Sequence, residues 1–185
     1  MIKFILHGGS KENDLPDDNL IREIFCKNKY IYKVLIVPFA RNNEDWDNVY
    51  EKYKRKYNKV SIKIVFDIAS KDKKILKMQF RDSDIIMFSG GGEFLLKRYI
   101  NKTFLLKNLK NKIVFGSSAG CNIFSKYYYS NDRKSVEKGL GILNIKTICH
   151  FNSENVIDLD ILNKKKNTPI MLAIGENQFI SIYHI

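Results

Sequence analysis

Short, unbroken apolar runs alternate with amphipathic segments along the whole chain of 185 residues. Continuous blocks of Ile, Val, Leu and Phe are typical of strands that are buried on both faces of a parallel sheet. Their alternation with helical segments predicts an α/β protein with a doubly wound, mostly parallel sheet flanked by helices. The expected strands are 2–6, 32–39, 60–68, 84–88, 112–115, 145–149, 170–174 and 179–185.

Amphipathic segments between these strands predict the helices. They are expected at 17–27, 43–57, 71–79, 93–100 and from Ala119 onward. Two segments fit the alternation poorly, 127–138 and 152–167, and we expect both to be loops that cross over the functional edge of the sheet as lids. No internal repeat, low-complexity tract or Pro/Gly linker interrupts the pattern, so we expect one domain over residues 1–185.

Composition and charge restrict the class of protein. The net charge is +12, but 26 of the 32 basic residues are lysines scattered along the chain, which favours a solvated surface over a nucleic-acid interface because base readout relies on arginine. The three cysteines have neither disulfide-framework nor metal-site spacing. No apolar stretch is long enough to span a membrane, and the N-terminus is too short and too weakly charged for a signal peptide. We therefore expect a cytoplasmic protein without a metal, a membrane or a nucleic-acid partner.

The strongest local motif is Gly116-Ser117-Ser118-Ala119-Gly120, directly after an apolar run. A G-x-S-x-G at a strand-to-helix turn is typical of a nucleophile elbow, in which small neighbours let the chain turn sharply and expose the central serine, here Ser118. The N–H of Ala119 would lie at a helix N-terminus, where it could stabilise an oxyanion. A phosphate-binding turn, or a turn that only packs, is the alternative.

A second glycine-rich turn, Ser89-Gly90-Gly91-Gly92-Glu93, also follows an apolar strand and precedes a helix. Consecutive glycines free the backbone to turn an N–H inward, so Gly92 is the expected second donor of an oxyanion hole. The turn lacks the G-x-G-x-x-G spacing of a dinucleotide site, and the chain has no P-loop motif. A nucleotide is therefore not expected here.

A serine nucleophile needs a base, and the chain offers His7, His150 and His184. His150 ends the expected strand 145–149 and enters a polar segment, so we predict that it is the general base and later the general acid. The carboxylate that would orient it is Glu176, just after the strand 170–174, or Asp132 in the polar segment 127–138. The sequence leaves this choice open.

Five motifs in order resemble the alpha-aspartyl dipeptidase (peptidase E) family of serine peptidases, which includes cyanophycinase and is related in fold to class I glutamine amidotransferases. They are Val37-Pro38-Phe39-Ala40 with Trp46-Asp47, Gly90-Gly91-Gly92, Gly116-Ser117-Ser118-Ala119-Gly120 with Asn122, Asn131-Asp132 with His150-Phe151, and Glu176-Asn177.

The resemblance implies a Ser-His-Glu triad of Ser118, His150 and Glu176. It further implies an oxyanion hole from the amides of Gly92 and Ala119, with Asp132 as a secondary candidate near the site. Two further residues at these motifs, Glu93 and Asn122, are candidates for substrate binding.

The chain departs from the family pattern in two places. Glu93 stands where peptidase E usually has Asn after the glycine triplet. The family's preference for an N-terminal aspartate relies on arginine after the catalytic histidine, and 152–167 contains none, so Lys164, Lys165 or Lys166 would have to supply the charge.

The sequence therefore predicts a serine exopeptidase that cleaves dipeptides or short peptides through an acyl-enzyme without a cofactor, as a monomer or homodimer. The alternatives are an esterase or amidase for a small non-peptide substrate, and a non-catalytic binding protein with a basic surface.

Overall fold

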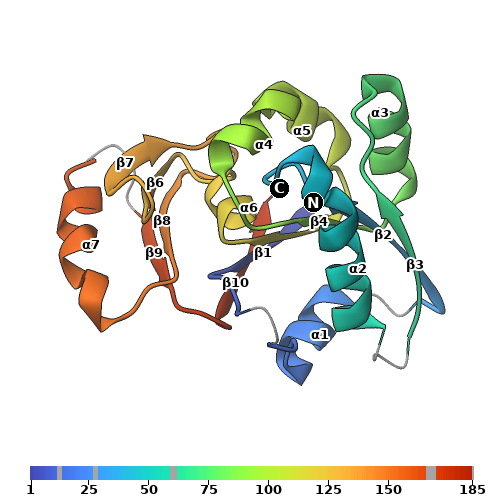
Figure 1. Cartoon of the computed structure of the whole chain (residues 1–185), viewed down its shortest axis with the longest axis horizontal. Coiled ribbons are helices and arrows are strands. Elements are labelled where there is room, and N and C mark those ends of the chain that lie inside the picture. The colour runs from blue at the N-terminus through green and yellow to red at the C-terminus, as the bar shows by residue number, and fades with distance from the viewer. Residues whose placement is uncertain (12–13, 27–28, 59–61, 166–169, 185) are drawn as a thin grey trace.

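The computed structural model describes residues 1–11, 14–26, 29–58, 62–165 and 170–184. These residues form two sheets with helices packed around them (Figure 1). Three expected elements, 17–27, 60–68 and 179–185, extend at one end beyond the described residues. Within the described part of the chain, the α/β architecture with mostly parallel sheets flanked by helices is confirmed.

The larger sheet has six strands in the order β10-β1-β5-β4-β2-β3. Five of them run parallel, and only β10 is antiparallel to its neighbour β1. Their bounds are Ile2–His7 (β1), Ile31–Val37 (β2), Lys63–Ile68 (β3), Ile85–Phe88 (β4), Ile113–Ser117 (β5) and Phe179–His184 (β10). The parallel strands end at one edge, which carries the residues that follow β1, β2, β4 and β5.

Helices cover both faces of this sheet, as its unbroken apolar strands require. Along β1, Phe4 and Leu6 belong to one core cluster, and Ile5 between them belongs to the other. The helices on the face of Ile5 are α1 (Asp18–Ile24) and α2 (Trp46–Tyr57), which follows a short 3-10 turn, η1 (Asn43–Asp45). On the opposite face lie α3 (Lys73–Asp82), α4 (Glu93–Tyr99), α5 (Lys102–Asn108) and α6 (Ala119–Asn122).

Helix α5 is not expected from the sequence. It begins at a cap in which the Asn101 side chain accepts a hydrogen bond from the Phe104 N–H, and it buries Leu105. Because it starts only three residues after α4 ends, its seven residues lack the two full turns over which a helical period becomes visible.

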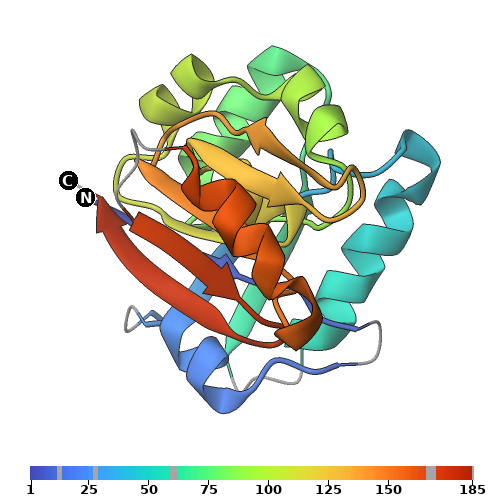
Figure 2. The same ribbon diagram turned by 90° about the vertical axis from the view of Figure 1, so that its left-hand side faces the viewer.

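The second sheet has the order β7-β6-β8-β9 and packs beside the first (Figure 2). Its strands are Tyr127–Ser130 (β6), Ser135–Lys138 (β7), Ile145–Cys149 (β8) and Ile170–Ile174 (β9). The expectation of a loop over 127–138 is wrong, because β6 and β7 form an antiparallel hairpin. Its turn, at Asn131 and Asp132, faces the functional edge.

The expectation of a loop over 152–167 is also wrong for the residues that the structure describes. A 3-10 turn, η2 (Ser153–Asn155), is closed by a capping box with Asn152 and leads into helix α7 (Val156–Asn163). Leu162 of α7 packs with Tyr129 and Ile148 of the second sheet. The helix therefore lies along the outside of this sheet and is not a lid (Figure 1).

Among the described residues, all three cysteines are free thiols, Cys26 exposed and Cys121 and Cys149 buried. No helix in the described ranges has the length and apolar character needed to cross a bilayer.

Candidate active site

The sheet topology brings four chain segments together at one edge. The register pairs His7 with Ser117, so the residues after β1 and β5 are neighbours. It also pairs Cys149 with Ile174, so His150 and Glu176 follow adjacent parallel strands. The two pairs belong to different sheets, and the His150 N–H joins them by donating to the Gly8 carbonyl just after β1.

Ser118 occupies a sharp turn between β5 and α6. Its backbone has φ 51° and ψ −111°, a conformation rarely adopted by a residue with a side chain. Gly120 permits the turn, because a Cβ at this position would lie 2.4 Å from the Phe88 carbonyl oxygen. This is the geometry of a nucleophile elbow.

Ser118, His150 and Glu176 form a chain of polar contacts. Ser118 Oγ lies 2.9 Å from His150 Nε2, and His150 Nδ1 lies 3.4 Å from Glu176 Oε1. The carboxylate and the imidazole are both about two-fifths exposed, so this end of the chain opens to solvent. Of the two carboxylates that the sequence left open, Glu176 contacts the histidine, whereas no hydrogen bond joins Asp132 to it.

The loop after β1 holds this arrangement in place. His150 N–H donates to the Gly8 carbonyl at 2.9 Å, and Asn177 N–H donates to the Gly9 carbonyl at 2.8 Å. Gly9 has φ 119°, and a Cβ there would lie 2.1 Å from His150 Cε1. Only glycine fits beneath the imidazole ring, so this residue fixes the ring's height above the sheet.

The two expected oxyanion donors differ in whether their N–H is already hydrogen-bonded within the protein. The Ala119 N–H has no acceptor among the described residues. The Gly92 N–H donates to the Ala40 carbonyl at 2.8 Å, so this amide is already bonded and the expectation for Gly92 is not met. The amides of Gly90 and Gly91, in the same turn, have no acceptor in the described part of the chain.

Asn122 and Glu93 lie behind the serine. Asn122 is buried; its Nδ2 donates to Glu93 Oε1 at 2.9 Å, and its Oδ1 accepts from Thr147 Oγ1 and Cys149 Sγ. Asn122 therefore ties α6 to α4 and β8. A hydrogen bond with Cys121 and burial raise the pKa of the Cys149 thiol, which keeps it protonated.

Two pockets meet at Ser118, Gly91, Arg41 and His150. We call the first the acidic pocket, because its charged groups include Asp45, Glu93 and Asp132. The second, the basic pocket, lies between α2 and the ends of β1 and β4. The charged and polar side chains of the basic pocket include those of His7, Ser10, Asp14, Arg41, Lys52, Lys56 and Ser89.

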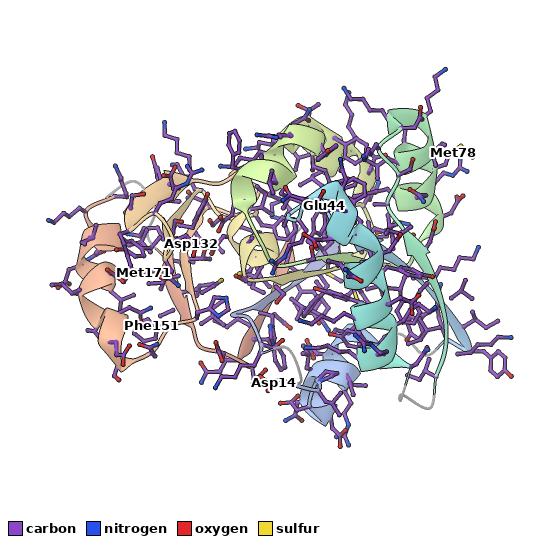
Figure 3. All side chains as sticks on the ribbon, in the orientation of Figure 1. Asp14, Glu44, Met78, Asp132, Phe151 and Met171 are labelled. Atoms are coloured by element: carbon purple, nitrogen blue, oxygen red, sulfur yellow. The ribbon has the colours of Figure 1, made fainter. Side chains whose placement is uncertain are left out.

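Figure 3 marks one residue of each pocket, Asp132 beside the second sheet and Asp14 beside α1. The lysines expected to supply positive charge lie elsewhere: Lys164 and Lys165 follow the last turn of α7 and line neither pocket, and Lys166 is outside the described residues. The cations at the site are instead Arg41, Lys52 and Lys56. Sequence reasoning missed them, although the i,i+4 spacing of the two lysines on one helix was visible.

No group of three or more metal-ligating side chains occurs among the residues described.

An α/β fold with a serine at a strand-to-helix turn, hydrogen-bonded to a histidine from another strand end, is the arrangement of serine hydrolases. Residues 4–184 match the sequence model of peptidase family S51, so the chain belongs to this family of serine peptidases.

Two solved structures share the fold. A peptidase from an acI-B1 Actinobacterium superposes with a TM-score of 0.71 at 21% identity, covering 98% of this chain and 84% of that chain. A protein from Listeria monocytogenes EGD-e assigned to peptidase E gives a TM-score of 0.68 at 18% identity, with 100% of both chains covered. No curated protein matches the chain.

Proposed function

We propose that this family member is an exopeptidase that hydrolyses dipeptides or short peptides through an acyl-enzyme, with Ser118, His150 and Glu176 as its triad. The observation that carries the proposal is the 2.9 Å contact between Ser118 Oγ and His150 Nε2 at a strained strand-to-helix turn. A serine hydroxyl becomes nucleophilic when a base takes its proton, and this contact supplies the base.

In the proposed reaction, Ser118 Oγ attacks the peptide carbonyl while His150 Nε2 accepts its proton. Glu176 accepts the Nδ1–H of His150 and stabilises the imidazolium that forms. Their 3.4 Å separation is long, as such bonds often are in an unliganded site. The Ala119 amide, with that of Gly90 or Gly91, would donate to the oxyanion.

His150 then gives its proton to the leaving amine, and the C–N bond breaks to leave an ester on Ser118. Water attacks this ester, with His150 again as the base, and releases the acid product. No cofactor takes part in the proposed reaction.

The preference for short peptides is supported by the acidic pocket. Asp45, Glu93 and Asp132 line it, and the Asn131 Oδ1 there is buried without a hydrogen-bond partner among the described residues. Carboxylate and amide oxygens are acceptors that fit the ammonium group of a free peptide N-terminus. A subsite for this group beside Ser118 would restrict cleavage to bonds near the N-terminus.

We also propose a cytoplasmic location, which rests on the composition and on the free thiols of the described cysteines.

The test compares wild type, Ser118→Ala and the matched control Ser153→Ala for amino-acid release from a dipeptide panel. Ser153 is an exposed serine in η2 and lines neither pocket. We expect Ser118→Ala to lower kcat/KM by roughly 10⁴-fold or more, and the control to keep it. A fluorophosphonate should label wild type at Ser118. Full activity in Ser118→Ala would refute the proposal, and cleavage of esters alone would replace the peptidase with an esterase.

A further inference from the structure

Helix α7 is apolar on two sides, although only one of them packs against the protein. Its inner side packs Leu159 and Leu162 onto the second sheet. Its outer side exposes Val156, Ile157 and Ile161, and Ile157 is 70% exposed. Figure 1 shows α7 at one end of the molecule, and Figure 2 shows it in front of the second sheet. A helix that is apolar all round is normally buried all round, so the outer side calls for a partner.

The outer side of this segment has the residue spacing of a coiled-coil seam. Glu154 of η2, Ile157, Ile161 and Lys164 follow one another at intervals of three, four and three residues, and all four are exposed. Because a helix has 3.6 residues per turn, residues at these intervals lie along one line on its surface. We call these four residues the α7 stripe. It has an apolar centre and charges of opposite sign at its two ends.

The charged ends of the α7 stripe are not neutralised by their own chain. Neither Glu154 nor Lys164 has an ion pair or a side-chain hydrogen bond among the described residues. Asp158 on the same helix is different, because it is buried and bonds the Tyr129 hydroxyl on the inner side. The carboxylate of Glu154 and the ammonium group of Lys164 are therefore free to pair with a molecule that docks on the outer side.

A second α7 stripe, laid antiparallel on the first, complements it in both respects. A two-fold axis at the level of Leu159 would bring Ile157 of each copy against Ile161 of the other, and Glu154 against Lys164. The apolar centre would then leave water, and opposite charges would meet at both ends. A parallel pair would instead place like charges together at each end, so the charges select the antiparallel arrangement.

We propose that the α7 stripe is a docking surface for a second copy of this chain, in a symmetric dimer whose two α7 helices pack antiparallel. The stripe is short, so the contact is smaller than the roughly 800 Å² per partner of a stable complex, and we expect a dissociation constant in the micromolar range or weaker. This inference does not depend on the proposed reaction, because the α7 stripe lines neither pocket.

Analytical ultracentrifugation of the full chain tests the association. Concentrations from about 1 μM to about 1 mM cover the dissociation constants of weak interfaces. An ionic strength of about 0.15 M screens the repulsion between two chains of net charge +12 beyond about 8 Å and affects pairs in contact much less. We expect the mass to rise from that of a monomer to that of a dimer. A monomer at every concentration would overturn the inference.

Ile157→Lys tests the apolar centre. Because Ile157 is mostly exposed, the monomer should stay folded, whereas the dimer would gain two charges at its centre. We expect the dissociation constant to rise by roughly 100-fold or more. Ile75→Lys is the matched control, since Ile75 is also an exposed isoleucine, on α3 at the other end of the molecule (Figure 1). Thermal melts check folding. A dimer that survives Ile157→Lys, or that the control weakens equally, would overturn the inference.

Reversal of the end charges tests the antiparallel orientation. Glu154→Lys or Lys164→Glu alone gives both ends of the stripe the same charge, so each variant should self-associate roughly tenfold more weakly than the wild type. An equimolar mixture of the two variants should dimerise about as tightly as the wild type, because opposite charges meet again at both ends. The double variant should do the same by itself. Single variants without effect, or a mixture that does not recover, would overturn the inference.

Discussion

The two pockets that meet at Ser118 differ in sign and in construction. The acidic pocket takes its carboxylates from three separate segments: η1 with Asp45, the start of α4 with Glu93, and the β6–β7 turn with Asp132. The basic pocket is lined mainly by α2 and by the ends of β1, β2, β4 and β5, and Leu20 of α1 and the residues His150 and Asn177 after β8 and β9 complete it. Both pockets therefore reach both sheets, but the β6–β7 turn lines the acidic pocket and not the basic one.

The difference means that a substrate bound at Ser118 would meet opposite charges in the two pockets. The acidic pocket offers mainly acceptors and the basic pocket mainly donors, and both pockets reach Ser118. Substitutions at the junction should affect every substrate, whereas substitutions in one pocket should affect only substrates with the matching charge.

The largest effect is expected at the junction, from Gly9→Ala. A Cβ there would lie 2.1 Å from His150 Cε1, so the ring must move, and a displacement of about 1 Å costs roughly 100-fold in rate. We expect kcat to fall by about that factor for all substrates alike. Gly92→Ala is the control, because its Cβ would meet Leu95 at an ordinary 3.8 Å and the amide is kept. A normal kcat in Gly9→Ala would show that the loop after β1 does not position the base.

The next largest effect is the pH dependence of folding stability that His7 of the basic pocket causes. His7 stays unprotonated in the folded protein down to about pH 4, whereas in the unfolded chain it binds a proton below about pH 6.5. Since the unfolded state binds more protons in this window, stability should fall by about 3 kcal/mol as the pH drops from 6.5 to 4.

His7→Gln, which cannot titrate, should lose this part of the pH dependence. Thermal melting from pH 7 to 4 measures it, and the wild-type Tm should fall further than that of the variant by about 2 to 4 °C for each kcal/mol. The charged groups that act on His7, namely Lys56, His150 and Asp17, are present in both proteins. Parallel Tm curves would contradict the assignment of a neutral, buried His7.

The smallest effect is expected in the acidic pocket. Asp45→Asn and Asp132→Asn should each raise KM for peptides with a free N-terminus by a few-fold to about tenfold, because solvent screens these partly exposed carboxylates. N-acetylated peptides should be unaffected. Glu44→Gln is the control, since Glu44 is next to Asp45 but lines neither pocket (Figure 3). An equal rise in KM for acetylated peptides would show that these carboxylates do not recognise the ammonium group of the peptide.

The larger sheet could be predicted from the sequence because most of its strands are largely apolar runs that need helices on both faces. In the second sheet, β8 and β9 were expected from the sequence, whereas β6 and β7 were not. Strand β6 reads Tyr-Tyr-Tyr-Ser and β7 reads Ser-Val-Glu-Lys, and neither has a continuous apolar block or a clean alternation. Helix α7 was missed because its apolar residues lie all round it: Leu162 is buried, while Ile157 is 70% exposed.

Ser118, His150 and Glu176 were predictable because each follows a strand that could be recognised. The partners of the Gly92 amide and the walls of the basic pocket were not. Lys52 and Lys56 lie within a helix whose charged positions resemble a solvated face, and only the packing of α2 against the sheet turns them toward the serine. Nor could the sequence show that the Ser89 hydroxyl is buried without a hydrogen-bond partner in the described part of the chain.

The positive φ angles of Ser118 and His150 affect which substitutions would stabilise the fold during evolution. With φ of 51° and 56°, both residues hold conformations that glycine adopts at little cost. Ser118→Gly should therefore melt at a higher temperature than the wild type while it loses the hydroxyl. Mutation of Ser118 to glycine would then stabilise the fold while it removes the nucleophile, so only selection for activity would keep the serine.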